Sequence, residues 1–514
     1  MAANRPVVIG VDSSTQSTKA VVVDAETGEV LALGRAPHTV TGTGGARESD
    51  PEQWWSALVS AVRAAVRDAG VPASAVTGLA VAGQQHGLVV LGADGRPLRP
   101  ALLWNDTRPA PQAAKLAAEL GGPEAWLGRT GSVPVAALTA AKWEWLRTHE
   151  PARAAATAAV RLPHDYLTER LTGRAVTDPG DASGTGWYGH GRTAPASAGM
   201  EPSPLSPSGG DGTSGGYDVE ILTHLGIDPS LLPAVAPTGA TPVGTLTPAA
   251  AEALGLPPAV VVAAGTGDNM AAAVGLGLGG AGLVDHPVVS LGTSGTVFAA
   301  TRSRPADPGL SGFAAADGTY LPLGCTLNCT LAVDRFATLL GLDRQDVRPG
   351  GEVVVLPYLD GERTPDLPHA AGLVTGLRHA TDPREVLGAA YEGAAFTVLR
   401  ALDGLLAACG LDPADPAARD RPIRLIGGGA RGRAWTDTVR RLSGRPVVVP
   451  GAEELVALGA AALAAGAVTG ADPVAVATEW GTGEGEQLPP LPRDTETWDR
   501  IARVLTSAAP TLLA

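Results

Sequence analysis

A short apolar run followed at once by a turn of small polar residues occurs three times in this chain. The three pairs of run and turn are Val7–Val11 with DSSTQSTK at 12–19, Val288–Leu291 with GTSGT at 292–296, and Ile423–Ile426 with GGGAR at 427–431. In the first two a second apolar run follows the turn, which predicts a β-hairpin. Because one hairpin opens each half of the chain, we expect two α/β domains of related design with a ligand between them.

Turns rich in Gly, Ser and Thr direct several backbone N–H groups to one point, and such concavities bind phosphate oxygens. Tight hairpins also need glycine for their geometry, so a single turn of this kind carries little weight. None of the three matches the Walker pattern or the dinucleotide fingerprint after a strand. Asp12, at the end of the first run, could hold Mg²⁺ through water, since this ion favours carboxylates together with phosphate oxygens. Alternatively, Asp12 only caps the turn.

The segment from Gly265 to Gly275 reads GTGDNMAAAVG and follows an apolar run. This pattern predicts a strand, a sharp turn and a helix, with Asp268 at the exit of a buried strand. Ligands of open α/β sheets collect at the carboxyl ends of the strands, which makes Asp268 a candidate general base. The alternative is structural, because Asp and Asn are preferred helix N-caps and Asp268 precedes Asn269.

Two further strand ends carry groups suited to a small polar ligand. GQQHG at 83–87 offers Gln85 and His86, an amide and an imidazole that can bind hydroxyl groups. Trp104, followed by Asn105 and Asp106, places an apolar face beside polar groups, as in many small-molecule pockets. The structural alternatives are a histidine with an internal partner and a tryptophan that fills the core.

Composition excludes several classes of function. The 514 residues suit about three domains or, equally well, two large ones. The net charge of −14 argues against nucleic acid or an anionic membrane as the main partner. Three cysteines without a CxxC pair predict neither a disulfide framework nor a zinc site. The N-terminus has no apolar region of signal-peptide type, and the apolar run Leu455–Val468 is too short to span a membrane. We therefore expect a soluble cytoplasmic protein.

The motifs together resemble those of the FGGY carbohydrate kinases, from about Val7 to about Val468. The resemblance is carried, in order, by DSSTQSTK at 12–19, DPEQWW at 50–55, GQQHG at 83–87, LLWNDTR at 102–108, LPHDYL at 162–167, GTGDN at 265–269, SLGTSG at 290–295, LPYLDGERTP at 356–365 and GGGAR at 427–431. A Gly/Ser/Pro-rich segment at 189–216 interrupts it and is expected to be a flexible surface insertion. Ser14 stands where many relatives have glycine, and Gln85 where many have methionine, which leaves the identity of the sugar open.

The resemblance implies an α/β, two-domain, actin-like ATPase (ribonuclease H-like) fold. The domains would span 1–279 and 280–514, close over a cleft and use ATP with Mg²⁺ to phosphorylate a sugar. The resemblance also allows a homodimer, since relatives are often dimers. It assigns catalysis to Asp268 as the base and to Asp12 near the Mg²⁺-bound phosphates. It assigns sugar binding to Gln85, His86, Trp104, Asp268 and Asn269, phosphate binding to Thr15, Gly292 and Thr293, and adenosine binding to Gly428 and Gly429.

Within the family, the joint occurrence of GQQHG, WND and GTGDN favours phosphorylation of D-xylulose at its C5 hydroxyl. An aspartate with an ordinary pKa of about 3.9 is ionised at neutral pH and can accept the hydroxyl proton. Ribulose, gluconate and glycerol are the alternative substrates. A non-catalytic sugar or nucleotide sensor is a rival from another class, but the first strand begins by Val7 and leaves no room for an N-terminal DNA-binding element. A chaperone or filament relative is disfavoured by the sugar-site motifs.

Overall fold

The computed structural model describes residues 5–189, 213–214, 216–280, 286–305, 307–367 and 369–512. The insertion expected to be flexible therefore lies almost entirely outside the described residues. The chain forms two compact units. Unit 1 contains Met1–Gly280, Gly312–Leu321 and Ala452–Gly483, and unit 2 contains Ala281–Ser311, Pro322–Gly451 and Glu484–Ala514. In addition to the break expected near residue 280, the chain thus returns to unit 1 twice.

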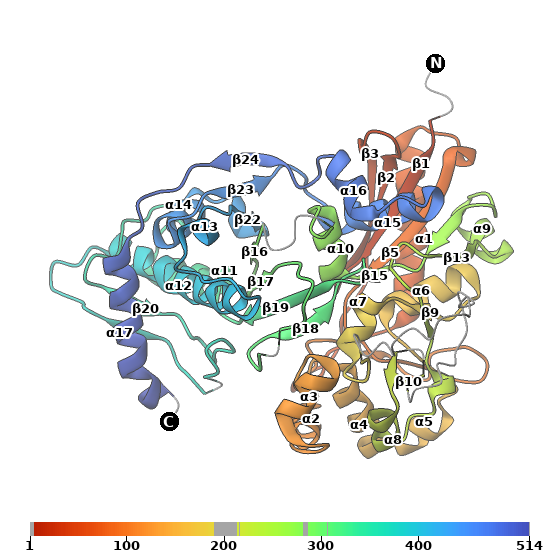
Figure 1. Cartoon of the computed structure of the whole chain (residues 1–514), viewed down its shortest axis with the longest axis horizontal. Helices are drawn as coiled ribbons and strands as arrows, with labels where there is room; N and C mark the ends of the chain where they lie inside the picture. Colours follow the sequence, from red (N-terminus) through yellow and green to blue (C-terminus); the bar gives the residue numbers. More distant parts are fainter. Residues whose placement is uncertain are drawn as a thin grey trace. The chain divides into compact units, whose positions relative to one another are not determined.

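Unit 1 is built on a mixed seven-stranded sheet whose central strands are parallel. Its strands are β1 (Val7–Ser13), β2 (Ser17–Asp24), β3 (Val30–Pro37), β5 (Val76–Gly83), β13 (Pro242–Thr245), β14 (Val261–Ala263) and β15 (Thr266–Gly267). The order is β13-β14-β5-β1-β2-β3, and β15 pairs with β5 (Figure 1). The predicted hairpin is confirmed as the antiparallel pair β1–β2, and β14, β5 and β1 run parallel.

The two faces of this sheet are covered by helices from opposite ends of the chain. Odd-numbered residues of β1, such as Ile9 and Val11, pack in one cluster with Trp54 of α1 (Pro51–Ala69). Since side chains alternate along a strand, Gly10 faces the other side, where an added Cβ would overlap the backbone of α15 (Leu455–Thr469). The absence of a side chain at Gly10 therefore lets α15 pack directly on the sheet.

Helix α15 is apolar enough to raise the question of whether it could span a membrane. Among the described residues no single helix is long and apolar enough to cross a membrane, and α15 with α16 (Pro473–Glu479) passes only as a pair bent by 116°. Residues Ala457 to Gly466 of α15 are buried inside unit 1. The apolar composition of α15 is explained by this packing against β1 and β5.

The second sheet also has seven strands, in the order β18-β19-β17-β16-β22-β23-β24. These strands are β16 (Val288–Leu291), β17 (Gly295–Phe298), β18 (Ser311–Ala314), β19 (Tyr320–Thr326), β22 (Ile423–Ile426), β23 (Val447–Pro450) and β24 (Gly485–Leu488). The second predicted hairpin is confirmed as β16–β17, and β22 runs parallel to β16 on its other side.

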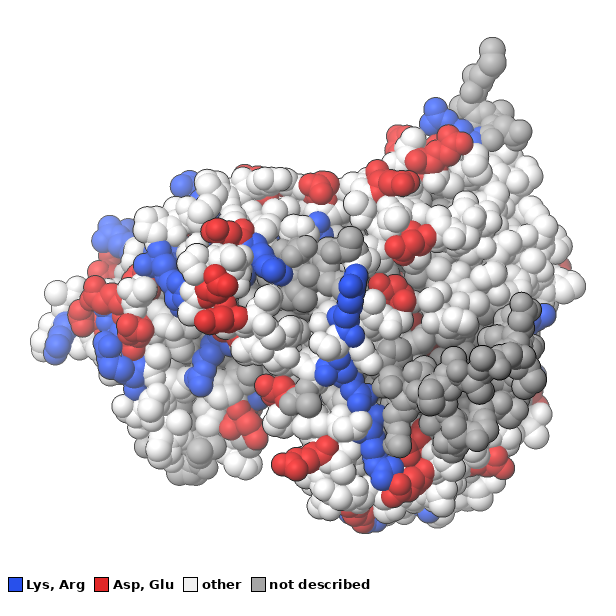
Figure 2. All heavy atoms as spheres, in the orientation of Figure 1, with Lys and Arg blue, Asp and Glu red and all other residues white. Residues whose placement is uncertain are grey.

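Unit 2 has its own core around a long helix. The spacing of apolar residues from Leu387 to Leu405 predicts a helix, and the structure confirms it as α12 (Pro383–Ala408). α12 packs on β17, α11 (Thr330–Leu340) and α14 (Arg433–Ser443), with most of its length buried. On the face shown in Figure 2, acidic and basic side chains are interspersed over this unit, so the negative net charge does not form one acidic surface there.

Candidate functional site

The carboxyl ends of three parallel strands of unit 1 lie in register. Asp12 of β1 pairs with Ala82 of β5, and Ala82 pairs in turn with Thr266 of β15. The residues that follow these positions therefore emerge at the same edge of the sheet. This register places the GQQHG segment, which follows β5, between the turn after Asp12 and the start of the helix at Asp268.

Asp268 is the first residue of helix α10 (Asp268–Gly275), and its N-cap is Gly267. The hypothesis that Asp268 is only an N-cap is therefore wrong. Gly265 has φ +81°, and a Cβ at this position would overlap the carbonyl oxygen of Val81 in β5. Only glycine fits this left-handed and crowded turn, which sets the direction in which the chain enters α10.

The Asp268 carboxyl has an unusual acidity. Its pKa is raised from 3.8 to about 7, chiefly by removal from water and also by the negative charges of Asp12 and Asp181, while a hydrogen bond from the Asn269 backbone N–H, 2.8 Å long, opposes the shift. The sequence-based expectation of an ordinary pKa near 3.9 is thus wrong. A carboxyl with a pKa of about 7 is a better general base at neutral pH than an ordinary one, because its proton affinity is higher and half of the groups remain ionised.

Two amides lie directly beside this carboxyl. Asn269 Nδ2 donates to Gln85 Oε1 over 2.8 Å and lies 3.3 Å from Asp268 Oδ1. Gln85 is buried, whereas Asn269 and Asp268 are half-buried. The structure therefore brings three of the predicted sugar-site residues together, with Gln85 holding the amide of Asn269 next to the carboxyl.

His86 is held in a strained backbone conformation. Its φ is +66°, a left-handed value that costs a residue with a side chain on the order of 1 kcal/mol or more. Its Nδ1 lies 2.9 Å from the Gly184 carbonyl oxygen, and a Cβ on Gly184 would overlap the imidazole. The ring centroid is 5.4 Å from that of Phe313. These contacts fix the orientation of the half-buried imidazole, as a ligand-binding group requires.

Trp104 is 45% exposed, so the alternative that it fills the core is wrong. Its Nε1 donates a hydrogen bond to Thr15 Oγ1 over 3.1 Å. Trp104 was predicted to line a sugar pocket and Thr15 to face phosphates. The structure thus joins a residue of each predicted subsite directly, with the apolar indole left accessible.

Asp12 lies at the end of β1 and is buried. Ser14 Oγ donates to its Oδ1 over 2.6 Å, and Lys19 Nζ lies 4.0 Å from its Oδ2 while pairing with Glu454 at 2.6 Å. Burial raises the pKa of Asp12, and Ser14 and Lys19 oppose this shift. Ser14 does not have a positive φ, so a serine is accommodated without strain where relatives have glycine. A carboxylate with a hydroxyl beside it fits the preference of Mg²⁺ for oxygen ligands.

Sequence reasoning missed a buried acidic network next to Asp268. His164 Nδ1 lies 2.6 Å from Asp181 Oδ2, and Thr266 Oγ1 donates to Asp178 Oδ2 over 2.7 Å. Burial raises the pKa of Asp178 to about 6 and that of Asp181 well above its usual range. His164, Asp165 and Asp181 lie close enough to share a metal ion, although His164 and Asp181 already bond each other. His164 lies in the LPHDYL motif, but nothing local in the sequence connects it with the acids of α7 (Pro179–Ala182) and its N-cap.

The predicted nucleotide-binding turns are neighbours within unit 2. Gly292 and Thr293 follow β16, Gly428 and Gly429 follow β22, and these two strands run parallel. A Cβ on Gly429 would lie 2.8 Å from the Leu291 Cβ, so glycine allows the second turn to approach the first. A Cβ on Gly428 would meet no atom within 4 Å, and Thr293 is exposed. Both turns thus present accessible backbone at one edge of the second sheet.

Comparison with known proteins connects this arrangement to a family. The N-terminal domain of the FGGY family of carbohydrate kinases matches residues 7–190 and 211–275, and its C-terminal domain matches residues 288–468. Xylulose kinases of Streptomyces rubiginosus and Streptomyces coelicolor are 55% and 56% identical to the chain, each over 99% of the chain and 98% of the relative. The crystal structure of xylulose kinase from Bifidobacterium adolescentis superimposes with a TM-score of 0.77 at 31% identity, covering 97% of this chain and 99% of the other. The fold is thus the two-domain actin-like fold of these kinases.

Proposed function

Since the chain belongs to the FGGY family of carbohydrate kinases, we propose that it transfers the γ-phosphoryl group of ATP to the C5 hydroxyl of D-xylulose. The observation that carries this proposal is the identity with xylulose kinases, which extends over nearly the whole of both chains. The site geometry agrees, because a carboxyl with raised proton affinity lies beside two amide groups that can bind a polyhydroxy ligand.

In the proposed reaction the hydroxyl oxygen of the sugar attacks the γ-phosphorus of ATP, and ADP leaves. Asp268 accepts the hydroxyl proton as the new O–P bond forms. Asn269, Gln85, His86 and Trp104 bind and orient the sugar. Phosphoryl transfer passes through a loose transition state, so that positioning and charge neutralisation supply most of the catalysis.

The phosphates of ATP are assigned to the hydroxyl-rich turns, with Thr15 in unit 1 and Gly292 and Thr293 in unit 2. Asp12 would hold Mg²⁺, because its carboxylate and the neighbouring hydroxyl are oxygen ligands of the kind that this ion prefers. The ion would neutralise charge on the phosphates. Gly428 and Gly429 are assigned to adenosine, because the open space at Gly428 lets a ligand approach the backbone.

Substrate choice is tested by measuring ADP release with D-xylulose, D-ribulose, gluconate and glycerol. We expect D-xylulose to give the highest kcat/KM. A higher value for another substrate would assign the enzyme to a different specificity in the family. The absence of sugar-dependent ADP release with every substrate would instead favour a non-catalytic sensor.

The acidity of Asp268 predicts a pH dependence of the reaction. A general base works only when deprotonated, so kcat/KM for D-xylulose should rise with pH, level off above about pH 7 and fall about tenfold per unit well below it. The residual activity of Asp268→Asn should lack this inflection. An inflection that remains unchanged in Asp268→Asn would assign the titration to another group.

A further inference from the structure

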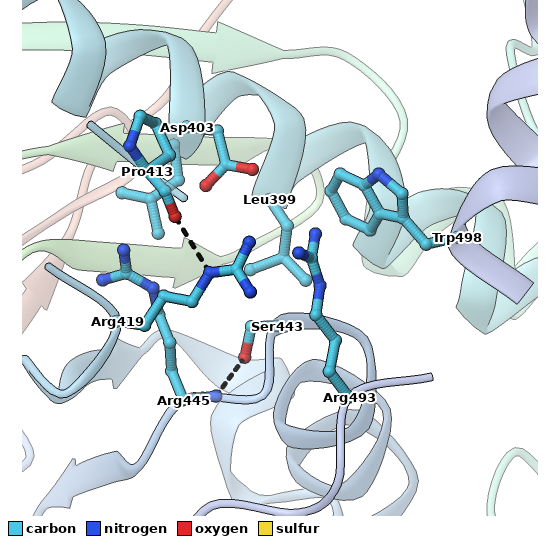
Figure 3. A pocket seen from close by; sticks show the side chains of 9 residues that line it. Leu399, Asp403, Pro413, Arg419, Ser443, Arg445, Arg493 and Trp498 are labelled. Carbon is cyan, nitrogen blue, oxygen red and sulfur yellow. Dashed lines mark hydrogen bonds between the residues drawn. The ribbon is translucent and has the colours of Figure 1, made fainter. Parts of the chain in front are cut away.

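Unit 2 contains a pocket that shares no residue with the turns at 292–293 and 427–429. It lies among α12, α13 (Pro416–Arg419), the end of α14 and the start of α17 (Thr495–Leu512). Three arginines, Arg419, Arg445 and Arg493, line it, and in Figure 3 the Arg419 guanidinium lies between those of the other two.

Arg445 forms the floor of this pocket and is only 2% exposed. Its two terminal nitrogens, Nη1 and Nη2, are buried and have no hydrogen-bond partner. Its backbone N–H is already bonded to Ser443 Oγ over 3.1 Å, and that hydroxyl donates to the Val439 carbonyl oxygen. A buried guanidinium without a partner is costly, since each unpaired buried donor forfeits its bonds with water.

The other two arginines are held in place by contacts that leave their outer nitrogens available. Arg419 Nε donates to the Pro413 carbonyl oxygen over 3.0 Å, and Arg493 Nε donates to the Leu442 carbonyl oxygen over 3.3 Å. The Arg493 guanidinium also stacks 5.0 Å from the ring centroid of Trp498. Both side chains are therefore oriented through Nε, while Nη1 and Nη2 face the pocket (Figure 3).

The charges in the pocket do not balance. Asp403 is the acidic residue of its lining; burial raises its pKa, and the positive charges of Arg445, Arg493 and Arg419 oppose that shift. Burial lowers the pKa of Arg445 and the negative charge of Asp403 opposes this shift, while the positive charges of Arg419, Arg421 and Arg493 add to it. Three guanidinium groups and one carboxylate leave an excess of two positive charges around a partly enclosed space.

We propose that this pocket is an anion-binding site that takes a phosphate group, with Arg445 at its floor and Arg419 and Arg493 at its sides. Guanidinium forks match the oxygens of a phosphate group and bind them through paired, charge-assisted hydrogen bonds. A bound dianion would supply partners for Nη1 and Nη2 of Arg445 and would balance the excess charge. The phosphate group can come from inorganic phosphate or from a phosphorylated sugar.

The test is thermal unfolding of the full-length protein with increasing potassium phosphate, compared with potassium chloride at the same ionic strength. Every sample contains saturating ADP and Mg²⁺, so that nucleotide sites are filled throughout. We expect phosphate to raise Tm by about 2–4 °C beyond chloride at saturation. A parallel titration with ribose 5-phosphate distinguishes the sources, because the source that acts at the lower concentration is the preferred ligand.

Two variants assign the effect to the pocket. Arg445→Met removes the buried charge at similar length, so we expect it to lose the phosphate-dependent rise and to be no less stable than wild type in chloride. Arg419→Gln, at the partly exposed side, should raise the phosphate concentration needed for half of the rise in Tm at least tenfold. The protein should remain folded. An equal rise in wild type and both variants, or no rise beyond chloride in wild type, would overturn the proposal.

Discussion

Replacing Asp268 by Asn is expected to lower kcat for D-xylulose by roughly two to four orders of magnitude, the usual contribution of a general base. Asn is nearly the same size, keeps the start of α10 and cannot accept the proton of the attacking hydroxyl. We expect KM to change much less, because the amides of Asn269 and Gln85 remain in place. Steady-state kinetics of ADP release measure both quantities. Turnover within a factor of about ten of wild type would remove Asp268 from its proposed role.

Unfolding measurements separate loss of the base from loss of the fold. The folded pKa of Asp268 is raised to about 7 from a reference value of 3.8, so the folded state holds the proton more tightly than the unfolded state. The contribution of Asp268 to the free energy of unfolding of wild type therefore falls as pH rises from about 4 to about 7, and it stays lower above that. Asp268→Asn lacks this penalty. It should be more stable than wild type at pH 8, and the difference should vanish below pH 4.

The second large effect is expected at a contact between two helices. Gly459 of α15 faces α10, where an added Cβ would overlap the Ala271 carbonyl oxygen and lie 2.9 Å from the Gly275 nitrogen. Both are backbone atoms, so one helix has to shift as a whole. Overpacking usually costs 1–3 kcal/mol, and we expect Gly459→Ala to reduce the free energy of unfolding by at least about 3 kcal/mol. Because α10 begins at Asp268, kcat should fall as well.

A matched control exists in another helix. Gly404 lies on an exposed side of α12, and a Cβ there would meet no atom within 4 Å. Gly404→Ala should therefore stabilise the protein by about 0.5–1 kcal/mol, since alanine is the better helix former. Denaturant unfolding of the two variants compares a crowded glycine with an open one. Similar effects of the two substitutions would show that the α10–α15 contact tolerates a side chain.

The parts of the site that could be predicted from sequence are those defined by local pattern. An apolar run ending in a small-residue turn identifies a strand end, and parallel strands bring such ends to one edge of a sheet. This reasoning selected Asp12, Gln85 and Asp268, and the register of β1, β5 and β15 places them at the same edge. The resemblance to FGGY kinases assigned a function to these motifs, and the comparisons support that assignment.

The rest depends on contacts between distant segments. Asp181 affects the acidity of Asp268 from 87 positions earlier in the chain, and no periodicity connects the two. The raised pKa of Asp268 needs both its burial and the neighbouring charges, which are known only once the chain is folded. The return of α15 to the first sheet is equally non-local.

The most direct test of the central claim is ³¹P NMR of D-xylulose, ATP and Mg²⁺ incubated with the wild-type enzyme and with Asp268→Asn. We predict that wild type forms one phosphate monoester, on the C5 oxygen of the sugar, for each ADP released. Asp268→Asn should form the same product at a rate lower by roughly two to four orders of magnitude. ADP and inorganic phosphate without a sugar phosphate, or equal rates of sugar phosphorylation by the two proteins, would contradict the account.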